Sequence, residues 1–270
     1  MKLAFSTLGC PDWKWEQILQ LAQSCGVEGI EIRGVEGHMQ AEEIPIFSPA
    51  HQEQTKQTLA EAGLVLTDFG TSAAFHNAGC AEEGDRECKT AIDLCSRMGI
   101  RAIRIFGDQL PDPAHPRKTI SMVGESILEL CAYAAPRGVD ILLEIHGDFR
   151  TIETVSPLLS ICKGRPNFGI IWDVEHSDRT YGEQWRPFYE TIRGFVRHVH
   201  IKDHIPTREG DFLLCPVGEG VIPIKAIVSA LEADGYSGYY SLEWEKKWHP
   251  ELADLDVILP AYCSYMRGLA

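Results

Sequence analysis

The sequence predicts an α/β protein folded as a single (β/α)8 barrel that spans residues 1–270. Short apolar segments rich in β-branched residues recur along the whole chain, as expected of buried parallel strands. Amphipathic segments of helical length separate them, and this alternation favours a parallel sheet whose strands are connected by helices. Eight such repeats in 270 residues match a closed barrel, whose usual size is about 250 residues.

The predicted elements follow one another in a regular order. The expected strands are Leu3–Thr7, Gly29–Arg33, Val65–Phe69, Ala102–Phe106, Ile141–Ile145, Gly169–Val174, Val196–Ile201 and Tyr239–Glu243. The amphipathic segments include Trp15–Cys25, Pro49–Ala62, Arg86–Met98, Ile120–Ala135 and Ile224–Ala233. Glycines such as Gly26 and Gly63 follow the expected helix ends, where a left-handed backbone closes a helix without steric cost.

A doubly wound open sheet is the alternative architecture for strands and helices that alternate. That fold would place a glycine-rich phosphate turn after an early strand, but Gly9-Cys10-Pro11 does not match the pattern GxGxxG. The closed barrel is therefore favoured. Two connections, about 34–48 and 202–222, are longer than usual. We interpret them as candidate lids or substrate walls, with plain irregular connections as the alternative.

The composition excludes several classes of protein. A net charge of −14 and a pI near 5.1 oppose binding to nucleic acid, which normally requires a basic face. No stretch approaches the roughly 20 apolar residues of a membrane span, and the first residues are too short in apolar content for a signal peptide. The nine cysteines show no paired metal-binding spacing. We expect a cytoplasmic protein with reduced, mostly buried thiols and no membrane partner.

Acidic or imidazole side chains stand at the ends of the last four expected strands. They are Glu144, Asp173, His200 and Glu243. In a barrel these strands are neighbours about 4.8 Å apart, so their carboxyl ends can converge on one point. Three carboxylates gathered there would repel one another unless a cation neutralised them. The pattern predicts a site for one divalent ion, Mn, Mg, Co or Zn, because oxygen and imidazole ligands suit these metals.

The segments around these four residues resemble the xylose-isomerase-like barrel superfamily of sugar isomerases and epimerases. The resemblance lies in Leu143–His146, Trp172–His176, His198–Asp203 and Ser241–Glu245, and in the connection Pro216–Pro223. It implies that Glu144, Asp173, His200 and Glu243 hold one divalent metal. It further implies a keto-sugar substrate and a reaction through an enediolate. The resemblance also implies a possible homo-oligomer.

The metal would polarise the substrate carbonyl, while Glu144 and Glu243 act as the acid and base on opposite sides of the reacting carbon. Proton return on the opposite face of the same carbon gives epimerisation. Proton return at the neighbouring carbon gives aldose–ketose isomerisation. The sequence leaves both outcomes open.

Further polar residues near the predicted metal are candidates for binding substrate. The resemblance implies this role for His176, three residues after Asp173. Alternation along a strand places His146 and Lys202 on the same face as the metal ligand two residues before each. Arg33, at the end of the second expected strand, either points into the barrel mouth or pairs with a carboxylate.

The long connection departs from the family pattern at one position. Family epimerases carry an arginine where this chain has Pro206, and the nearest arginine here is Arg208. Arg208 is therefore a candidate substrate-binding residue, and this departure leaves the identity of the substrate open.

Other functions are compatible with the same barrel. A lyase similar to inosose dehydratase, or one acting on keto-glycosides, would use the same metal and expel a hydroxyl group from the enediolate. An endonuclease would need extra histidine ligands from the first strands and a basic face, and the sequence has neither. A protein that only binds ligands would have no physical need to keep clustered carboxylates.

Overall fold

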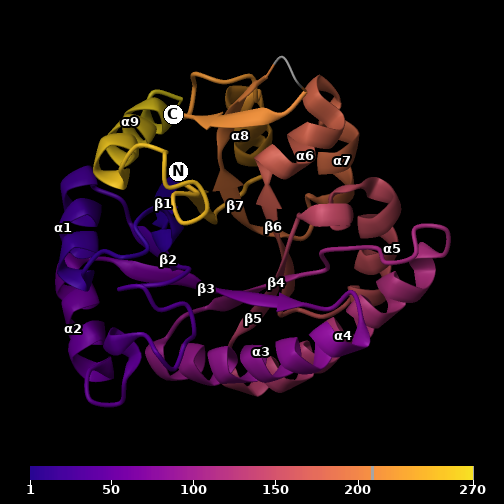
Figure 1. Cartoon of the computed structure of the whole chain (residues 1–270), viewed down its shortest axis with the longest axis horizontal. Coiled ribbons are helices and arrows are strands. Elements are labelled where there is room, and N and C mark those ends of the chain that lie inside the picture. Colours follow the sequence, from indigo (N-terminus) through magenta and orange to yellow (C-terminus); the bar gives the residue numbers. More distant parts are fainter. Residues whose placement is uncertain (208–209, 270) are drawn as a thin grey trace. The chain divides into compact units, whose positions relative to one another are not determined.

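The computed structural model describes residues 1–207 and 210–269. Within these residues, eight parallel strands close into a barrel in the order β1-β10-β7-β6-β5-β4-β3-β2, which confirms the predicted (β/α)8 fold (Figure 1). The barrel strands are β1 (Lys2–Ser6), β2 (Gly29–Ile32), β3 (Val65–Ala74), β4 (Ala102–Phe106), β5 (Asp140–Glu144), β6 (Phe168–Asp173), β7 (Val196–Ile201) and β10 (Tyr239–Leu242).

The chain forms two compact units, the first of Met1–Thr67 with His198–Ala270 and the second of Asp68–Arg197. In the first unit, β10 pairs in parallel with β1 and β7, and β1 pairs with β2. Its helices are α1 (Trp15–Cys25), α2 (Gln52–Ala62), α8 (Ile224–Ala233) and α9 (Leu255–Arg267). Helix α9 packs against α1 in this unit, where Arg267 donates to the carbonyl groups of Cys25 and Gly26 at the end of α1.

The second unit contains a run of parallel strands from β3 to β6. Its helices are α3 (Ala78–Met98), α4 (Pro116–Ala134), α5 (Ile152–Cys162), α6 (Val174–Tyr181) and α7 (Arg186–Ile192). In Figure 1, α3, α4 and α5 follow one another outside these strands, and neighbouring helices in this row pack together. Each connection returns the chain to the start of the next strand, so the carboxyl ends of all the strands in this unit lie at one edge.

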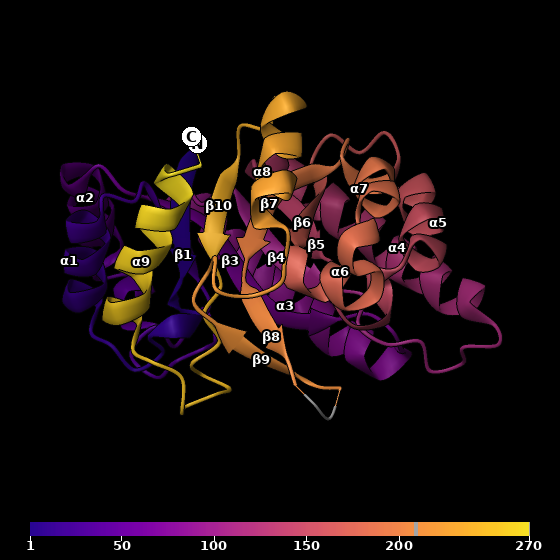
Figure 2. The ribbon, with the colours of Figure 1, turned by 90° about the horizontal axis from the view of Figure 1, so that it is seen from above.

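The long connection after β7 is more regular than expected. It contains an antiparallel hairpin of β8 (Asp203–Pro206) and β9 (Phe212–Cys215), which lies beyond the carboxyl end of β7 (Figure 2). Asp203 stabilises the return of this connection, because its carboxylate accepts hydrogen bonds from the backbone N–H groups of Gly218, Gly220 and Ile222. In its described residues, 203–207 and 210–222, the connection therefore forms a hydrogen-bonded wall at the carboxyl end of β7.

Several other elements differ from the sequence prediction. Strand β3 continues five residues beyond the expected end, to Ala74. Helix α5 contains Pro157, a residue that normally signals a helix end, and α6 is only 8 residues long, so neither gave a clear helical pattern. Short 3-10 helices occupy Thr7–Gly9, Pro45–Phe47, Ala135–Arg137, Gly147–Arg150 and Gly182–Gln184.

The structure also bears on the cysteines and on possible membrane spans. All nine cysteines are free, and every one except Cys80 is buried, which agrees with the expected burial of the thiols. Burial raises the pKa of Cys131 and of Cys162 to about 12. Among the described helices, none combines the length and the apolar character needed to cross a membrane.

Candidate active site

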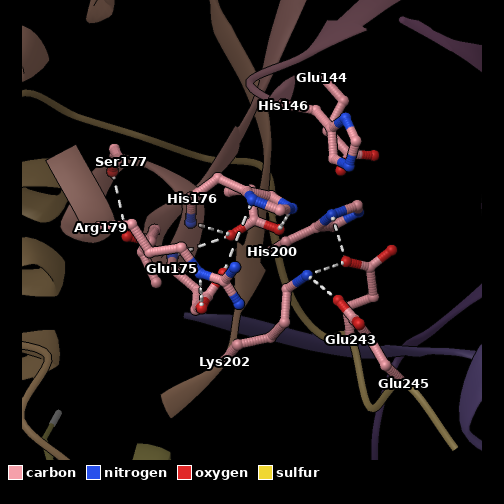
Figure 3. Close-up of polar contacts among 12 residues, drawn as sticks. Glu144, His146, Glu175, His176, Ser177, Arg179, His200, Lys202, Glu243 and Glu245 are labelled. Atoms are coloured by element: carbon pink, nitrogen blue, oxygen red, sulfur yellow. Dashed lines mark hydrogen bonds and ion pairs between the residues drawn. The ribbon is translucent and has the colours of Figure 1, made fainter. Parts of the chain in front are cut away.

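The first unit brings the predicted ligands His200 and Glu243 into contact. His200 lies on β7 in register with Ser241 of β10, and Glu243 is the first residue after β10. Nδ1 of His200 is 3.2 Å from Oε2 of Glu243, and both side chains are buried (Figure 3). The pair therefore presents an imidazole nitrogen and a carboxylate oxygen at the carboxyl ends of neighbouring strands.

The other ring nitrogen of His200 faces a carboxylate that was not among the predicted site residues. Nε2 of His200 is 3.0 Å from Oε2 of Glu31, a fully buried residue of β2. Although burial favours the neutral carboxyl group, the neighbouring His200 and His198 hold the pKa of Glu31 well below its usual value. Burial lowers the pKa of His200, but Glu243 and Glu31 outweigh this effect and raise the pKa well above its usual value. The two carboxylates therefore favour the protonated form of His200.

Lys202 is the third predicted residue that the first unit brings to this place. Its ammonium group lies 2.7 Å from Oε2 of Glu243 and 2.6 Å from Oε1 of Glu245 (Figure 3). The side chain is 1% exposed, so these contacts are shielded from solvent. Lys202 thus holds the Glu243 carboxylate in place. It also links Glu243 to Glu245 in one polar network.

The second unit holds the other two predicted ligands, Glu144 at the end of β5 and Asp173 at the end of β6. Each has a carboxylate oxygen within 4.8 Å of the other, and both side chains are buried. Arg104, on the neighbouring strand β4, places Nη1 3.0 Å from Oε2 of Glu144. Its Nη2 donates to the carbonyl oxygen of Thr71, and its guanidinium lies over the ring of Phe106. This buried arginine was not among the predicted site residues.

Asp173 has a second role as the N-cap of α6. Its Oδ1 accepts from the backbone N–H groups of Glu175 and His176, at 2.8 and 3.1 Å. These bonds satisfy two donors that the first turn of the helix leaves unpaired. The imidazole of His176 then lies with Nε2 3.8 Å from Oδ2 of Asp173 and Nδ1 3.6 Å from Oε2 of Glu175. The predicted substrate-binding histidine is thus held beside the predicted ligand by the helix that this ligand caps.

His146 also lies close to His176, with ring centroids 4.5 Å apart and the rings nearly perpendicular. Its Nδ1 is 3.2 Å from Oδ1 of Asp108, a residue in the connection after β4. Asp108 adopts a φ of 66°, which is uncommon for a residue other than glycine and is found most often at functional sites. Gly147 allows this arrangement, because a Cβ there would lie 2.3 Å from the carbonyl oxygen of Asp108. The half-exposed His146 is therefore oriented by an acidic partner.

The two predicted arginines have different outcomes. Arg33 is buried directly after β2, and its backbone N–H donates to Oγ1 of Thr7. Arg208 lies outside the described residues. The structure also adds Glu31, Arg104 and Asp108 to the predicted set. A charged residue between two isoleucines, as in Ile30-Glu31-Ile32 and Ile103-Arg104-Ile105, is the sequence signal that indicates an inward polar side chain in a barrel strand.

The residues of each unit fit a divalent cation. In the first unit, a metal ion can take the place of the proton on Nδ1 of His200, next to the Glu243 carboxylate, while Nε2 keeps its bond to Glu31. In the second unit, two buried carboxylates lie next to each other, an arrangement that a cation stabilises. Carboxylate and imidazole donors are ligands that Mn, Mg, Co and Zn all accept, so the donor types do not select one of these metals.

Comparison with known proteins decides the family. A family model described as "Xylose isomerase-like TIM barrel" matches residues 19–258. The chain belongs to this family. Among curated relatives, a "Putative L-ribulose-5-phosphate 3-epimerase SgbU" from Haemophilus influenzae is 23% identical over 89% of this chain and 87% of its own length. The relatives of this xylose isomerase-like barrel are thus named as enzymes, in agreement with the prediction of an enzyme.

Solved structures agree on the fold. The "probable 3-DHS dehydratase AsbF" from Bacillus anthracis superposes with a TM-score of 0.79 at 19% identity, and covers 99% of both chains. A structure described as "IOLI protein with a binding zinc atom" superposes with a TM-score of 0.76 at 18% identity, and covers 100% of this chain and 98% of that chain. The xylose isomerase-like barrel is therefore shared over the full length of both proteins.

Proposed function

We propose that this protein is a divalent-metal-dependent epimerase or isomerase of keto-sugars. The observation that carries the proposal is the set of buried ligand side chains at the carboxyl ends of β5, β6, β7 and β10, which are consecutive in the closed barrel. The names of its epimerase relatives support the reaction class, and zinc in one structural neighbour supports a metal. The single domain, cytoplasmic location and homo-oligomer predicted from the sequence remain predictions.

In this proposal, four residues hold one ion, Mn, Mg, Co or Zn. They are Glu144, Asp173, His200 and Glu243. When bound, the ion would supply a Lewis acid that polarises the substrate carbonyl. The protein provides the orientation of its ligands: Asp173 is fixed by the backbone of α6, and His200 is fixed by its bond to Glu31. Asp173 and His200 act as ligands only.

Glu144 and Glu243 have the additional role of moving protons. One carboxylate removes the proton next to the substrate carbonyl, and the other returns a proton. The two residues have different cationic neighbours, the guanidinium of Arg104 beside Glu144 and the ammonium of Lys202 beside Glu243. This difference would let one carboxylate start as the base and the other deliver the proton, because the two environments are unequal.

We assign substrate contacts to His176, His146, Lys202, Arg33 and Arg208. His146 and His176 form one face of the site in the second unit, where their rings meet edge to face. Lys202 belongs to the network in the first unit, and its contacts with two carboxylates favour a role in positioning Glu243 as well as binding a substrate hydroxyl. The substrate is a small carbohydrate, free or phosphorylated.

The reaction class can be tested by solvent exchange in D2O. The protein, first treated with chelator and then loaded with Mn2+, Mg2+, Co2+ or Zn2+, is incubated with free ketoses, ketose phosphates, inososes and 3-keto-glycosides. Deuterium at the carbon next to the carbonyl, with conversion of the sugar and no loss of water, is the expected result. Absence of exchange for every substrate with every metal would contradict the proposal.

Asp173 provides a test of metal binding that is separate from turnover. Asp173→Asn keeps an N-cap residue, because asparagine caps helices as well as aspartate does, but it replaces a charged ligand by a neutral amide. We expect the dissociation constant for Mn2+, measured by calorimetry, to rise by about 100-fold or more. This is a larger loss of affinity than is usual for residues that only hydrogen-bond to a metal ligand. Asp93→Asn, which removes a surface carboxylate paired with Arg137 in the same unit, should leave Mn2+ affinity unchanged. Equal Mn2+ affinity in Asp173→Asn and wild type would exclude Asp173 as a ligand.

A lyase acting on an inosose-like ketone or a keto-glycoside is the second candidate. It is favoured by the contact between His146 and Asp108, because an oriented imidazole is suited to protonate a departing hydroxyl group. The dehydratase among the structural neighbours supports the same class. In the D2O experiment, a product that has lost water and gained the ultraviolet absorbance of a diketone would favour the lyase over the epimerase.

A further inference from the structure

We infer that Glu31 is a positioning residue that fixes the ring of His200 so that Nδ1, and not Nε2, is offered to the metal. The inference rests on the proposed function, because it concerns how the chain prepares one of the proposed ligands. It starts from a buried contact that belongs to β2 and β7, strands whose residues are far apart in the sequence.

The contact with Glu31 determines which nitrogen of His200 carries a hydrogen. Nε2 lies 3.0 Å from Oε2 of Glu31, a normal hydrogen-bond distance. A carboxylate can only accept, so this contact requires the hydrogen to be on Nε2. Nδ1 also faces a carboxylate, Oε2 of Glu243 at 3.2 Å, but Glu243 is itself a proposed metal ligand, so a metal can take the place of the Nδ1 hydrogen while Nε2 keeps its own. The contact therefore selects one of the two possible ligand atoms.

The acceptor oxygen of Glu31 is itself held in place. Oε2 of Glu31 also receives hydrogen bonds from Nε2 of His198 at 3.1 Å and from Oγ of Ser241 at 3.0 Å. These donors come from β7 and β10, so the oxygen is held by two strands besides its own. Glu31 is fully buried, and within the described residues its other oxygen has no hydrogen-bond partner, so all three donors meet on a single atom.

Water cannot replace the Glu31 carboxylate as the acceptor for His200. Glu31, His200 and Ser241 are all 0% exposed, so solvent does not reach the Glu31 carboxylate. If a neutral amide replaces the carboxylate, the acceptor of the Nε2 hydrogen is weaker and can turn its NH2 group toward the ring, so the ring can rotate or change the nitrogen that carries the hydrogen. A residue that hydrogen-bonds to a metal-binding histidine typically contributes about 10–100-fold to metal affinity, because it orients the ring and increases the basicity of the ligand nitrogen.

The inference is tested with Glu31→Gln and a matched control, Ser241→Ala. The control removes one donor from the same oxygen and leaves the bond to His200. Both variants and wild type are stripped with chelator, checked for folding by circular dichroism, and titrated with Mn2+ and Co2+ by calorimetry. We expect Glu31→Gln to raise the dissociation constant about 10–100-fold and Ser241→Ala to remain within about twofold of wild type.

A second measurement is made on the wild type, and a variant serves only to assign the signal. In Co2+-loaded wild type, the Nε2 hydrogen of a ligand bound through Nδ1 should give one strongly shifted proton NMR signal. This signal should be present in H2O, absent in D2O and slow to exchange. His200→Gln identifies it by its loss.

The outcomes separate this inference from the proposed function. Equal metal affinity in Glu31→Gln and wild type, equal losses in both variants, or no such exchangeable signal would overturn the role of Glu31 while the metal site stands. If wild type binds neither Mn2+ nor Co2+, the proposed function fails and the inference fails with it.

Discussion

Glu243→Gln is expected to lower kcat for keto-sugar conversion by about 10²–10⁴-fold, the usual contribution of a general acid or base. Glutamine keeps an oxygen that can bind a metal and keeps the shape of the side chain, but it cannot accept or deliver the proton. Exchange of the substrate proton with D2O should fall by a similar factor. Turnover and exchange are both measured at saturating metal, and the bound metal is determined by elemental analysis.

Glu245→Gln is the matched control for this variant. Glu243 and Glu245 both contact the ammonium of Lys202, at 2.7 and 2.6 Å, so each substitution removes one carboxylate from the same lysine. Only Glu243 also contacts His200 in the first unit. We expect Glu245→Gln to retain kcat within about tenfold. Full activity in Glu243→Gln with metal bound would limit this residue to ligation, and equal losses in both variants would assign the effect to Lys202 instead.

Arg104→Met is expected to destabilise the metal-free protein by about 3–5 kcal/mol, the usual cost of removing one member of a buried ion pair. The Arg104 and Glu144 side chains are 3% and 2% exposed, so water cannot replace the guanidinium beside the carboxylate. The substitution also removes the donor to the Thr71 carbonyl. Urea unfolding in the presence of chelator gives the free energy of unfolding for wild type and variant.

Lys89→Met is the control, because it breaks an ion pair with Asp85 whose side chains are 43% and 35% exposed. A surface pair of this kind contributes about 0–1 kcal/mol, so unfolding should change little. In Mn2+-saturated protein, the loss in Arg104→Met should become smaller, because the bound cation supplies positive charge next to Glu144. A loss below about 1 kcal/mol without metal would show that Arg104 is not needed to stabilise the buried carboxylate.

The strand ends of the candidate site could be read from the sequence because they depend on local pattern. Each of Glu144, Asp173 and His200 ends or nearly ends a short apolar segment, and alternation along a strand gives the face on which it lies. The repeated strand and helix pattern then gives the barrel, and the barrel makes these strands neighbours. The family resemblance depends on the same short segments.

The helices and the hairpin that were missed have weaker local signals. Helix α5 contains a proline, and the segment from β8 to β9 includes Pro206 and short strands of 4 residues each. Proline is typical of turns and edges, so these segments predict irregular chain when considered alone. Contacts with other elements decide their conformation instead: α5 packs against α4 and α7, and β8 pairs with β9.

The sequence by itself therefore determined the barrel, the order of its strands along the chain and the polar residues at the strand ends. Only the tertiary structure decided the partners of those residues: Glu31 with His200, Arg104 with Glu144, and Asp108 with His146. The physical reason is the distance along the chain, because Glu31 and His200 are 169 residues apart and meet only when β2 and β7 take their places in the sheet. Alternation predicts that a side chain points inward, whereas strand order and register select the atom that it meets.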